Sequence, residues 1–248
     1  MSNRRAIPER TRYDQGMRKT PYFLPALLFV STALSTAARA EGFKSSIYEQ
    51  GSNKTKLLFT GERVEKGNQA TVTTQSPDGK VAVIEEATVQ EGDPSKIVRF
   101  QIHQKQTGEE GTLEVKDGKL HFSYTKNGKT DTDTEDYKEN TIVGPTTLPY
   151  LKKHWDKILA GDDVDVRYAS LDRKETVGFK FFKIGETDKA IIVKMKPTSI
   201  VIAAIVDPLI FTFYKDGSKL YELKGRAVPK RNVDGKWKDL DADIVFKY

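Results

Sequence analysis

The sequence of 248 residues contains no cysteine and only three histidines. The absence of cysteine excludes disulfides, thiolate nucleophiles, iron–sulfur clusters and cysteine-ligated zinc. Neither the Gly-x-Ser-x-Gly elbow of serine hydrolases nor a glycine-rich phosphate-binding loop occurs in the chain. The histidines, His103, His121 and His154, lack the spacing that presents two imidazoles to one metal ion. We therefore expect no catalytic residues, no metal site and no cofactor.

Acidic residues are plentiful, but their spacing does not match a calcium loop. The densest run lies at residues 131–139. An EF-hand loop counted from Asp131 needs glycine at its sixth position and glutamate at its twelfth, where this chain has Asp136 and Ile142. We interpret the run as a solvated loop or an edge strand. His103 and His121 would meet only if their two strands pair directly.

Excess positive charge is confined to the first 40 residues. The chain has 41 basic and 35 acidic residues; seven and two of these lie in residues 1–40, which leaves 34 and 33 in residues 41–248. A basic protein often binds nucleic acid or anionic lipid. Because the main part of this chain is almost neutral, we do not expect nucleic acid as a partner.

The first 40 residues have the pattern of a secretory signal peptide. Met17-Arg18-Lys19 is a short basic region, residues 22–34 are apolar, and Ala38-Arg39-Ala40 supplies the small residues of a cleavage site. The apolar stretch is shorter than the roughly 20 residues that cross a bilayer. We expect residues 1–16 to be an extension upstream of the true start and residues 17–40 to be a signal peptide cleaved before Glu41. The mature protein would then be periplasmic, without a stable membrane span.

Turn dipeptides and β-branched residues dominate the remainder of the chain. Asp-Gly or Asn-Gly pairs, which close hairpins, occur at 78–79, 117–118, 127–128, 216–217 and 234–235. Twelve strand-like runs lie at 56–65, 70–75, 81–89, 97–106, 113–115, 120–125, 164–169, 176–184, 190–195, 209–214, 220–228 and 243–248. Several alternate apolar and polar residues, as strands with one buried face do. We predict a mainly β protein: a curved antiparallel sheet or half-open barrel of about 10–12 strands, with one or two short helices packed on it. Residues 41–248 would form a single β-rich domain, with two lobes split near residue 145 as the alternative.

One segment has helical periodicity. Its apolar residues are Leu148, Leu151, Trp155, Ile158 and Leu159. Their spacing places them on one face of a helix over residues 147–160, and Gly161 suits its C-terminal cap. The apolar stretch 200–206 is either a second short helix or a buried strand, because periodicity alone does not separate the two.

Apolar residues concentrate in the C-terminal half, as a filled core or as a ligand groove beneath the helix. The candidate groove residues are Leu151, Trp155, Phe179, Phe181, Met195, Phe211 and Phe213. We expect a non-enzymatic binding or carrier protein for a lipid-like small molecule or an envelope protein. The alternatives are a small outer-membrane β-barrel, which the C-terminal Tyr248 suggests, and a hydrolase without a recognisable motif.

The part of the chain from residue 147 to residue 248 carries a series of short motifs. They are L-x-x-L-x-x-x-W-x-x-I-L-x-G, V-D-V-R-Y, M-K-P-T-S followed by an apolar run ending in D-P, F-x-F-Y, and L-K-G-R-A-V-P. In these motifs the segment resembles the C-terminal half of uncharacterised exported bacterial β-proteins. A curved sheet wrapped on a helix is also similar in architecture to periplasmic lipoprotein carriers and lipocalin-like proteins.

Overall fold

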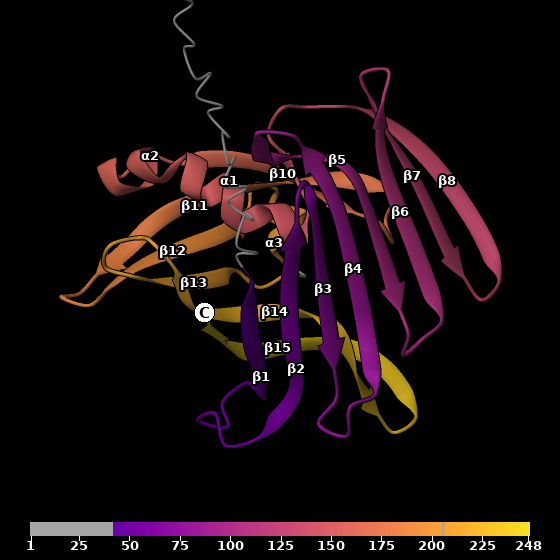
Figure 1. The fold of residues 1–248 in the computed structure, drawn as a ribbon, viewed down its shortest axis with the longest axis horizontal. Coiled ribbons are helices and arrows are strands. Elements are labelled where there is room, and N and C mark those ends of the chain that lie inside the picture. The colour runs from indigo at the N-terminus through magenta and orange to yellow at the C-terminus, as the bar shows by residue number, and fades with distance from the viewer. Residues whose placement is uncertain (1–41, 205) are drawn as a thin grey trace, which may run out of the picture. The chain divides into compact units, whose positions relative to one another are not determined.

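The computed structural model describes residues 42–204 and 206–248, so the expected extension and signal peptide lie outside the described residues. The chain is mainly β and forms one large, curved, unclosed sheet of 15 strands (Figure 1). The strands are β1 (Phe43–Glu49), β2 (Leu57–Lys66), β3 (Gln69–Gln75), β4 (Val81–Gln90), β5 (Asp93–Gln104), β6 (Glu109–Lys116), β7 (Lys119–Lys126), β8 (Lys129–Asp136), β9 (Thr141–Ile142), β10 (Val164–Ser170), β11 (Glu175–Glu186), β12 (Ala190–Pro197), β13 (Leu209–Tyr214), β14 (Leu220–Val233) and β15 (Lys236–Lys247). The short helices are the 3-10 turn η1 (Gly144–Thr146), α1 (Thr147–Lys153), α2 (Trp155–Ala160) and α3 (Ile200–Ala203). In the part of the chain that the structure describes, no helix has the length and apolar character of a membrane span.

The sheet has more strands than the predicted 10–12. Each of the twelve predicted runs corresponds to a strand, and β1, β8 and β9 are additional. Strand β8 consists of charged residues and threonines, and β9 has only two residues, so hydrophobic alternation does not reveal either one. Strand β8 forms one edge of the sheet and is largely exposed, which confirms that the acidic run is an edge strand.

The strands are ordered as a meander that begins in the middle of the sheet. The order runs from β8 back to β1, then from β15 back to β9. Strand β1 pairs with β15, so the strands before residue 145 and the strands after it belong to one continuous sheet. The neighbours are antiparallel as predicted, except for β9 and β10, which are parallel and are joined through η1, α1 and α2. Asp117, Asn127 and Asp234 have positive φ together with the following glycine, the geometry of tight hairpin turns.

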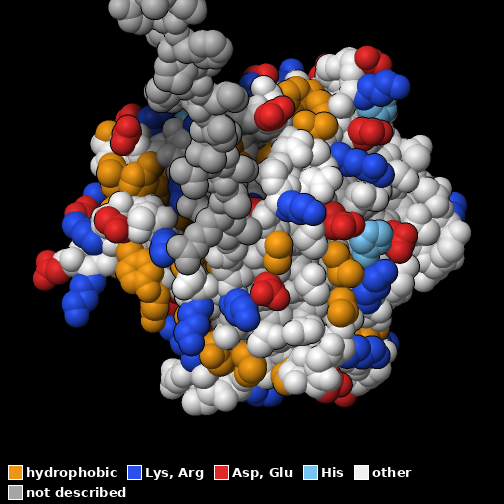
Figure 2. All heavy atoms as spheres, viewed as in Figure 1, with side chains coloured by type: hydrophobic (Ala, Val, Ile, Leu, Met, Phe, Trp, Pro, Cys, Tyr) orange, Lys and Arg blue, Asp and Glu red, His pale blue; other side chains and the backbone are white. Residues whose placement is uncertain are grey.

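Polar and apolar residues separate onto the two faces of the sheet. Figure 2 shows acidic and basic side chains interspersed over the outer face of β3–β7. On the inner face, one cluster beneath the helices includes Leu151 and Phe213, and a second includes Phe100 and Leu113. A third cluster lies where β1, β2, β4, β14 and β15 meet, with Ile47 among its members. In strands such as β7 and β12 the alternation of the sequence therefore indicates which side is buried.

The predicted helix at residues 147–160 is present, but it is broken at His154 into α1 and α2. His154 has φ −108° and ψ 18°, outside the helical region. Gly161 ends α2 with φ 92°, and its amide donates a hydrogen bond to the Ile158 carbonyl at 3.2 Å. The predicted C-terminal cap is therefore confirmed.

The apolar stretch 200–206 contains the short helix α3, so it is not the buried strand that the sequence also allowed. Ile200 is 90% exposed and Val201 is 75% exposed. The Thr198 amide donates to the Gly178 carbonyl at 3.0 Å, and the chain then leaves the sheet. Because no described element covers α3, its apolar residues do not contribute to the core in the way that the sequence suggested.

The curved sheet is held near its ends by side chains. The Glu135 carboxylate of edge strand β8 accepts hydrogen bonds from the Thr176 amide at 3.1 Å and the Thr176 hydroxyl at 2.7 Å. On another side, the Gln104 side chain of β5 donates to the Val228 carbonyl of β14 at 3.1 Å. The edge strands β8 and β9 do not pair with each other, so the sheet remains unclosed. We call the junction between Glu135 and Thr176 the seam.

The helix cap gives a test of the local geometry. Gly161→Ala is expected to lower the free energy of unfolding by about 1 kcal/mol, because an alanine at positive φ is strained. Gly185→Ala is the control: its φ is not in the left-handed region, and an added Cβ would meet only Ile192 Cδ1, at 3.7 Å. Urea unfolding of both variants measures the difference, and equal losses would contradict the assigned cap.

Candidate functional site

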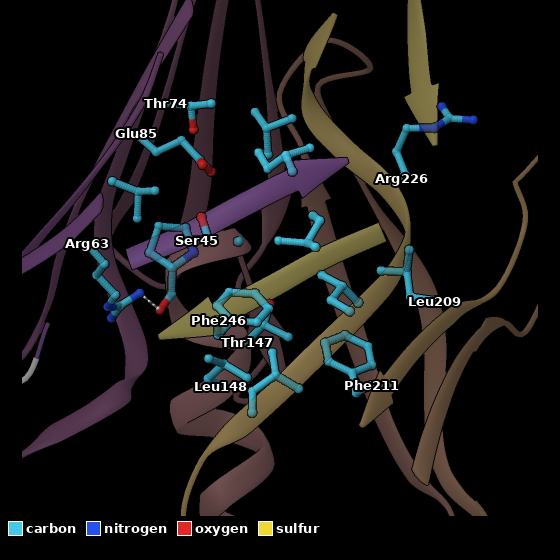
Figure 3. Close-up of a pocket in the computed structure, with 18 of the residues that line it drawn as sticks. Ser45, Arg63, Thr74, Glu85, Thr147, Leu148, Leu209, Phe211, Arg226 and Phe246 are labelled. Carbon is cyan, nitrogen blue, oxygen red and sulfur yellow. Dashed lines mark hydrogen bonds between the residues drawn. The ribbon is translucent and has the colours of Figure 1, made fainter. Parts of the chain in front are cut away.

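A cavity of about 190 Å³ lies on the inner face of the sheet. Residues of β1–β4 line one side and residues of β12–β15 line the other, while η1, the first turn of α1 and Tyr168 of β10 contribute the rest (Figure 3). Most of the lining side chains are apolar, among them Phe43, Ile47, Leu148, Leu209, Phe211 and Phe246. The cavity is therefore an apolar space bordered by both halves of the chain.

Strand alternation and register together place this apolar lining on one face. Ile47 of β1 lies opposite Ile244 of β15, which lies opposite Leu223 of β14. Leu223 in turn lies opposite Phe211 of β13. Residues directly opposite each other on neighbouring strands share a face of the sheet. An apolar row thus crosses four strands and forms the floor of the cavity.

Of the seven groove residues predicted from sequence, five are buried in the core cluster beneath the helices, and two of these five also reach the cavity. Met195 and Phe211 line the cavity. Leu151, Phe181 and Phe213 are almost inaccessible and belong to the cluster beneath the helices. The structure thus shows packed side chains beneath α1 and α2, and it places the cavity next to the first turn of α1.

The two remaining candidates, Trp155 and Phe179, pack at the border of the same core cluster. The Trp155 ring lies 4.8 Å from the Phe213 ring, centroid to centroid, and its indole covers Gly217 so closely that a Cβ there would meet Nε1 at 2.3 Å. Phe179 packs edge-on to Tyr168, with ring centroids 6.3 Å apart. Neither side chain lines the cavity.

Two buried charged residues lie at one end of the cavity. Arg63 of β2 is 8% exposed and Glu85 of β4 is 6% exposed. Arg63 Nε donates to Glu65 Oε1 at 2.7 Å, and its Nη1 donates to the Pro145 carbonyl at 2.8 Å. The guanidinium is therefore fixed in position by β2 itself and by η1.

The Glu85 carboxyl group has a different environment. It forms no hydrogen bond with any residue that the structure describes, and it lies against Gly144, where an added Cβ would be 2.8 Å from Oε1. Burial raises the pKa of Glu85 to about 7, and the positive charge of Arg63 opposes this rise. Burial also raises the pKa of the nearby Tyr168, and the negative charge of Glu85 adds to that rise. Near neutral pH, Glu85 can thus be either a hydrogen-bond donor or an anion.

A third charged residue, Arg226, touches the cavity but is paired elsewhere. Its Nε donates to Asp241 at 2.9 Å and its Nη1 donates to Asp239 at 2.6 Å. Figure 3 shows its guanidinium turned away from the other labelled residues. The charge available within the cavity therefore comes from Arg63 and Glu85.

A second, more polar space of about 160 Å³ adjoins the first one. Glu85, Tyr168 and Val228 line both spaces. The second space also contains Glu109, whose Oε1 lies 2.8 Å from the Nζ of Lys126. Glu85 thus stands between an apolar cavity and a polar one.

The histidines lie apart from this cavity. His103 lies between Glu86 and Glu110, with nitrogen–oxygen distances of 3.5 and 3.2 Å. Strand β6 separates the strands of His103 and His121, so the two imidazoles do not meet. Within residues 42–204 and 206–248, no group of three or more acidic or histidine side chains is arranged to hold a metal ion.

Sequence reasoning missed Arg63 and Glu85, although a signal was present. In the strand 81–90, every second residue from Val81 to Val89 is apolar except Glu85. A single acid in the buried set of an alternating strand is a candidate functional residue. Arg63 interrupts the buried set of β2 in the same way, after Phe59 and Gly61.

Of the comparisons with protein families, curated proteins and solved structures, the comparison with solved structures gives a match. No protein-family model matches the sequence, and no curated protein is significantly similar to it. Among solved structures, the chain is similar to a beta-barrel-like protein of a domain of unknown function, DUF1849, from Brucella abortus. The TM-score is 0.38 and the sequence identity is 11%, over 83% of this chain and 93% of that chain.

Proposed function

We propose that the protein is a non-enzymatic binding or carrier protein that holds an apolar or amphiphilic ligand in the cavity of about 190 Å³. The observation that carries the proposal is the composition of the lining, which is mostly apolar with charged groups at one end. An apolar pocket with a few convergent polar groups is typical of small-molecule sites. The apolar row across β1, β15, β14 and β13 would contact the hydrocarbon part of the ligand.

We further propose that the protein acts in the periplasm after export. The support is the order of basic region, apolar stretch and small residues in residues 17–40. Osmotic shock of cells that produce the full chain is expected to release a protein whose first residue is Glu41. An N-terminus upstream of Glu41, or retention in the cytoplasm, would contradict the proposal.

Partial filling of the cavity tests ligand binding. Leu148 lines the cavity from the first turn of α1, whereas Leu159 of α2 is 40% exposed. Leu148→Trp is expected to weaken binding of a fluorescent naphthylamine probe by about tenfold or more, because the larger side chain occupies ligand space. Leu159→Trp, the same substitution on the exposed side, is expected to leave the affinity unchanged.

Two outcomes of this titration count against the proposal. One is a wild-type protein that does not bind the probe and carries no lipid-like molecule in native mass spectrometry. The other is an equal affinity of wild type and Leu148→Trp, which would place the probe outside the cavity.

A further inference from the structure

We propose that the charged end of the cavity binds a zwitterionic head group, so that the ligand is an amphiphile with one anionic and one cationic group close together. The anionic group would face Arg63 and the cationic group would face Glu85. This inference rests on the proposed function, because it names the class of ligand for the same cavity.

The first argument is the spacing of the two charges. Arg63 lies opposite Val72 of β3, and Val72 lies opposite Glu85 of β4, so the three residues share one row of the inner face. Two strand spacings separate the backbones of Arg63 and Glu85 by about 10 Å. The two side chains do not form an ion pair, although each is more than nine-tenths buried. The cavity therefore contains two opposite charges held apart by an apolar residue.

The second argument is that Glu85 has no partner among the described residues. Figure 3 shows its carboxyl group turned toward the other residues of the lining. A buried carboxylate without a hydrogen-bond donor or counter-charge is costly, so such groups are normally paired. Burial raises the pKa of Glu85, and the charge of Arg63 offsets this rise only in part. An ammonium group of a ligand would supply both the counter-charge and the donors.

The third argument is that the Arg63 guanidinium is fixed in orientation but has a nitrogen that donates no hydrogen bond to the described residues. Its Nε and Nη1 bind Glu65 and Pro145, which leaves Nη2 without a partner among the described residues. A guanidinium with a fixed orientation and unused donors suits a phosphate or carboxylate oxygen. Arg63 also lies over the ring of Phe43, with Cζ 5.9 Å from the centroid, which limits its motion further.

Other head groups complement this pair less well. A purely anionic head group would satisfy Arg63 but would bring a like charge toward Glu85, and a purely cationic one would do the reverse. An uncharged head group would leave Glu85 without a partner among the described residues and would leave Nη2 of Arg63 unused. A zwitterion presents the opposite sign to each residue, which is the arrangement that electrostatic complementarity favours.

Four probes with the same acyl or alkyl chain length separate these possibilities. They are a lysophosphatidylethanolamine, a fatty acid, an alkylammonium and a monoacylglycerol, titrated below their micelle concentrations into the mature protein at pH 8. The zwitterionic probe is expected to bind at least about tenfold more tightly than each of the others, because it forms charge-assisted contacts at both ends of the row.

The Glu85→Gln variant tests the assignment of the cationic group. This substitution conserves volume and removes the charge, so we expect it to weaken binding of the zwitterion by about tenfold. Binding of the monoacylglycerol is expected to change by less than about twofold, which shows that the apolar part of the cavity is intact. Glu86→Gln, on the exposed face of the same strand, is the control and is expected to change neither affinity.

The outcomes distinguish this inference from the proposed function. If none of the four probes binds, the proposed function fails and this inference fails with it. Equal affinities for all four probes, or a preference for the fatty acid or the alkylammonium, would be consistent with the proposed apolar binding cavity. Either result would overturn the proposal that the ligand has a zwitterionic head group. Tight binding of the zwitterion that Glu85→Gln does not change would also overturn the assignment.

Discussion

Replacement of Leu151 by alanine is expected to lower the free energy of unfolding by about 3 kcal/mol, whereas the same replacement of Leu159 should cost less than about 1 kcal/mol. Leu151 is completely buried in the cluster that joins α1 to the inner face of the sheet, and Leu159 is 40% exposed. A buried leucine that becomes alanine loses its transfer free energy and leaves a void that its neighbours fill only in part.

Comparison of the two leucine variants separates the effect of burial on stability from the effect of helix propensity. Both positions lie in the helical segment between β9 and β10, and both receive the same side chain. Urea unfolding monitored by circular dichroism gives the two losses of stability. Equal losses would mean that α1 does not pack on the sheet in the way described above.

At pH 8 the Glu85→Gln variant is expected to be more stable than the wild-type protein by up to about 3 kcal/mol, and at pH 4 the two should be equally stable. The pKa of Glu85 is raised from 4.5 to about 7 in the folded protein. Between these values the folded state binds a proton that the unfolded state has lost, so wild-type stability falls as the pH rises from 4.5 to 7. Glutamine does not ionise, so the variant lacks this loss.

The measurement is the free energy of unfolding of both proteins from pH 4 to pH 9. Arg63 and Tyr168 are the charged and titratable groups that act on Glu85, and both are present in wild type and variant. Contributions from groups that do not interact with Glu85 cancel in the difference between the two curves, which therefore reports the ionisation of Glu85 together with its interactions with these two residues. Curves that run parallel over the whole range would show that Glu85 is ionised normally, and Glu86→Gln supplies the reference for an exposed glutamate.

Local patterns in the sequence predict most of the fold. Asp-Gly and Asn-Gly pairs mark hairpins, and alternating strands such as 120–124 show which face is buried. The spacing of Leu151 and Ile158 indicates a helix, and Gly161 indicates its end. Strand β9 escapes prediction, and the sequence leaves β8 as either a loop or an edge strand, because their pairing partners, and not their own side chains, make them strands.

The cavity depends on information of longer range. Phe213 and Phe211 are the same residue type on the same strand and both belong to the core cluster beneath the helices, yet of the two only Phe211 also lines the cavity. The curvature of the whole sheet decides which row of apolar residues is left without a facing layer, and no local pattern encodes that curvature. The pairing of Arg63 and Glu85 in one row is of intermediate range, because the two-residue turn 67–68 and the five-residue loop 76–80 set the register of β2, β3 and β4.

The seam between Glu135 and Thr176 has a mechanical consequence. A fully hydrogen-bonded barrel has a fixed girth, because any change in circumference breaks its backbone ladder. In this protein no backbone hydrogen-bond ladder joins the edges of the sheet, and edge strand β8 is held by the contacts of the Glu135 side chain with Thr176. A small increase in circumference therefore strains these contacts and leaves every strand pair intact. The width of the enclosed space can thus change without breaking the backbone hydrogen bonds between neighbouring strands.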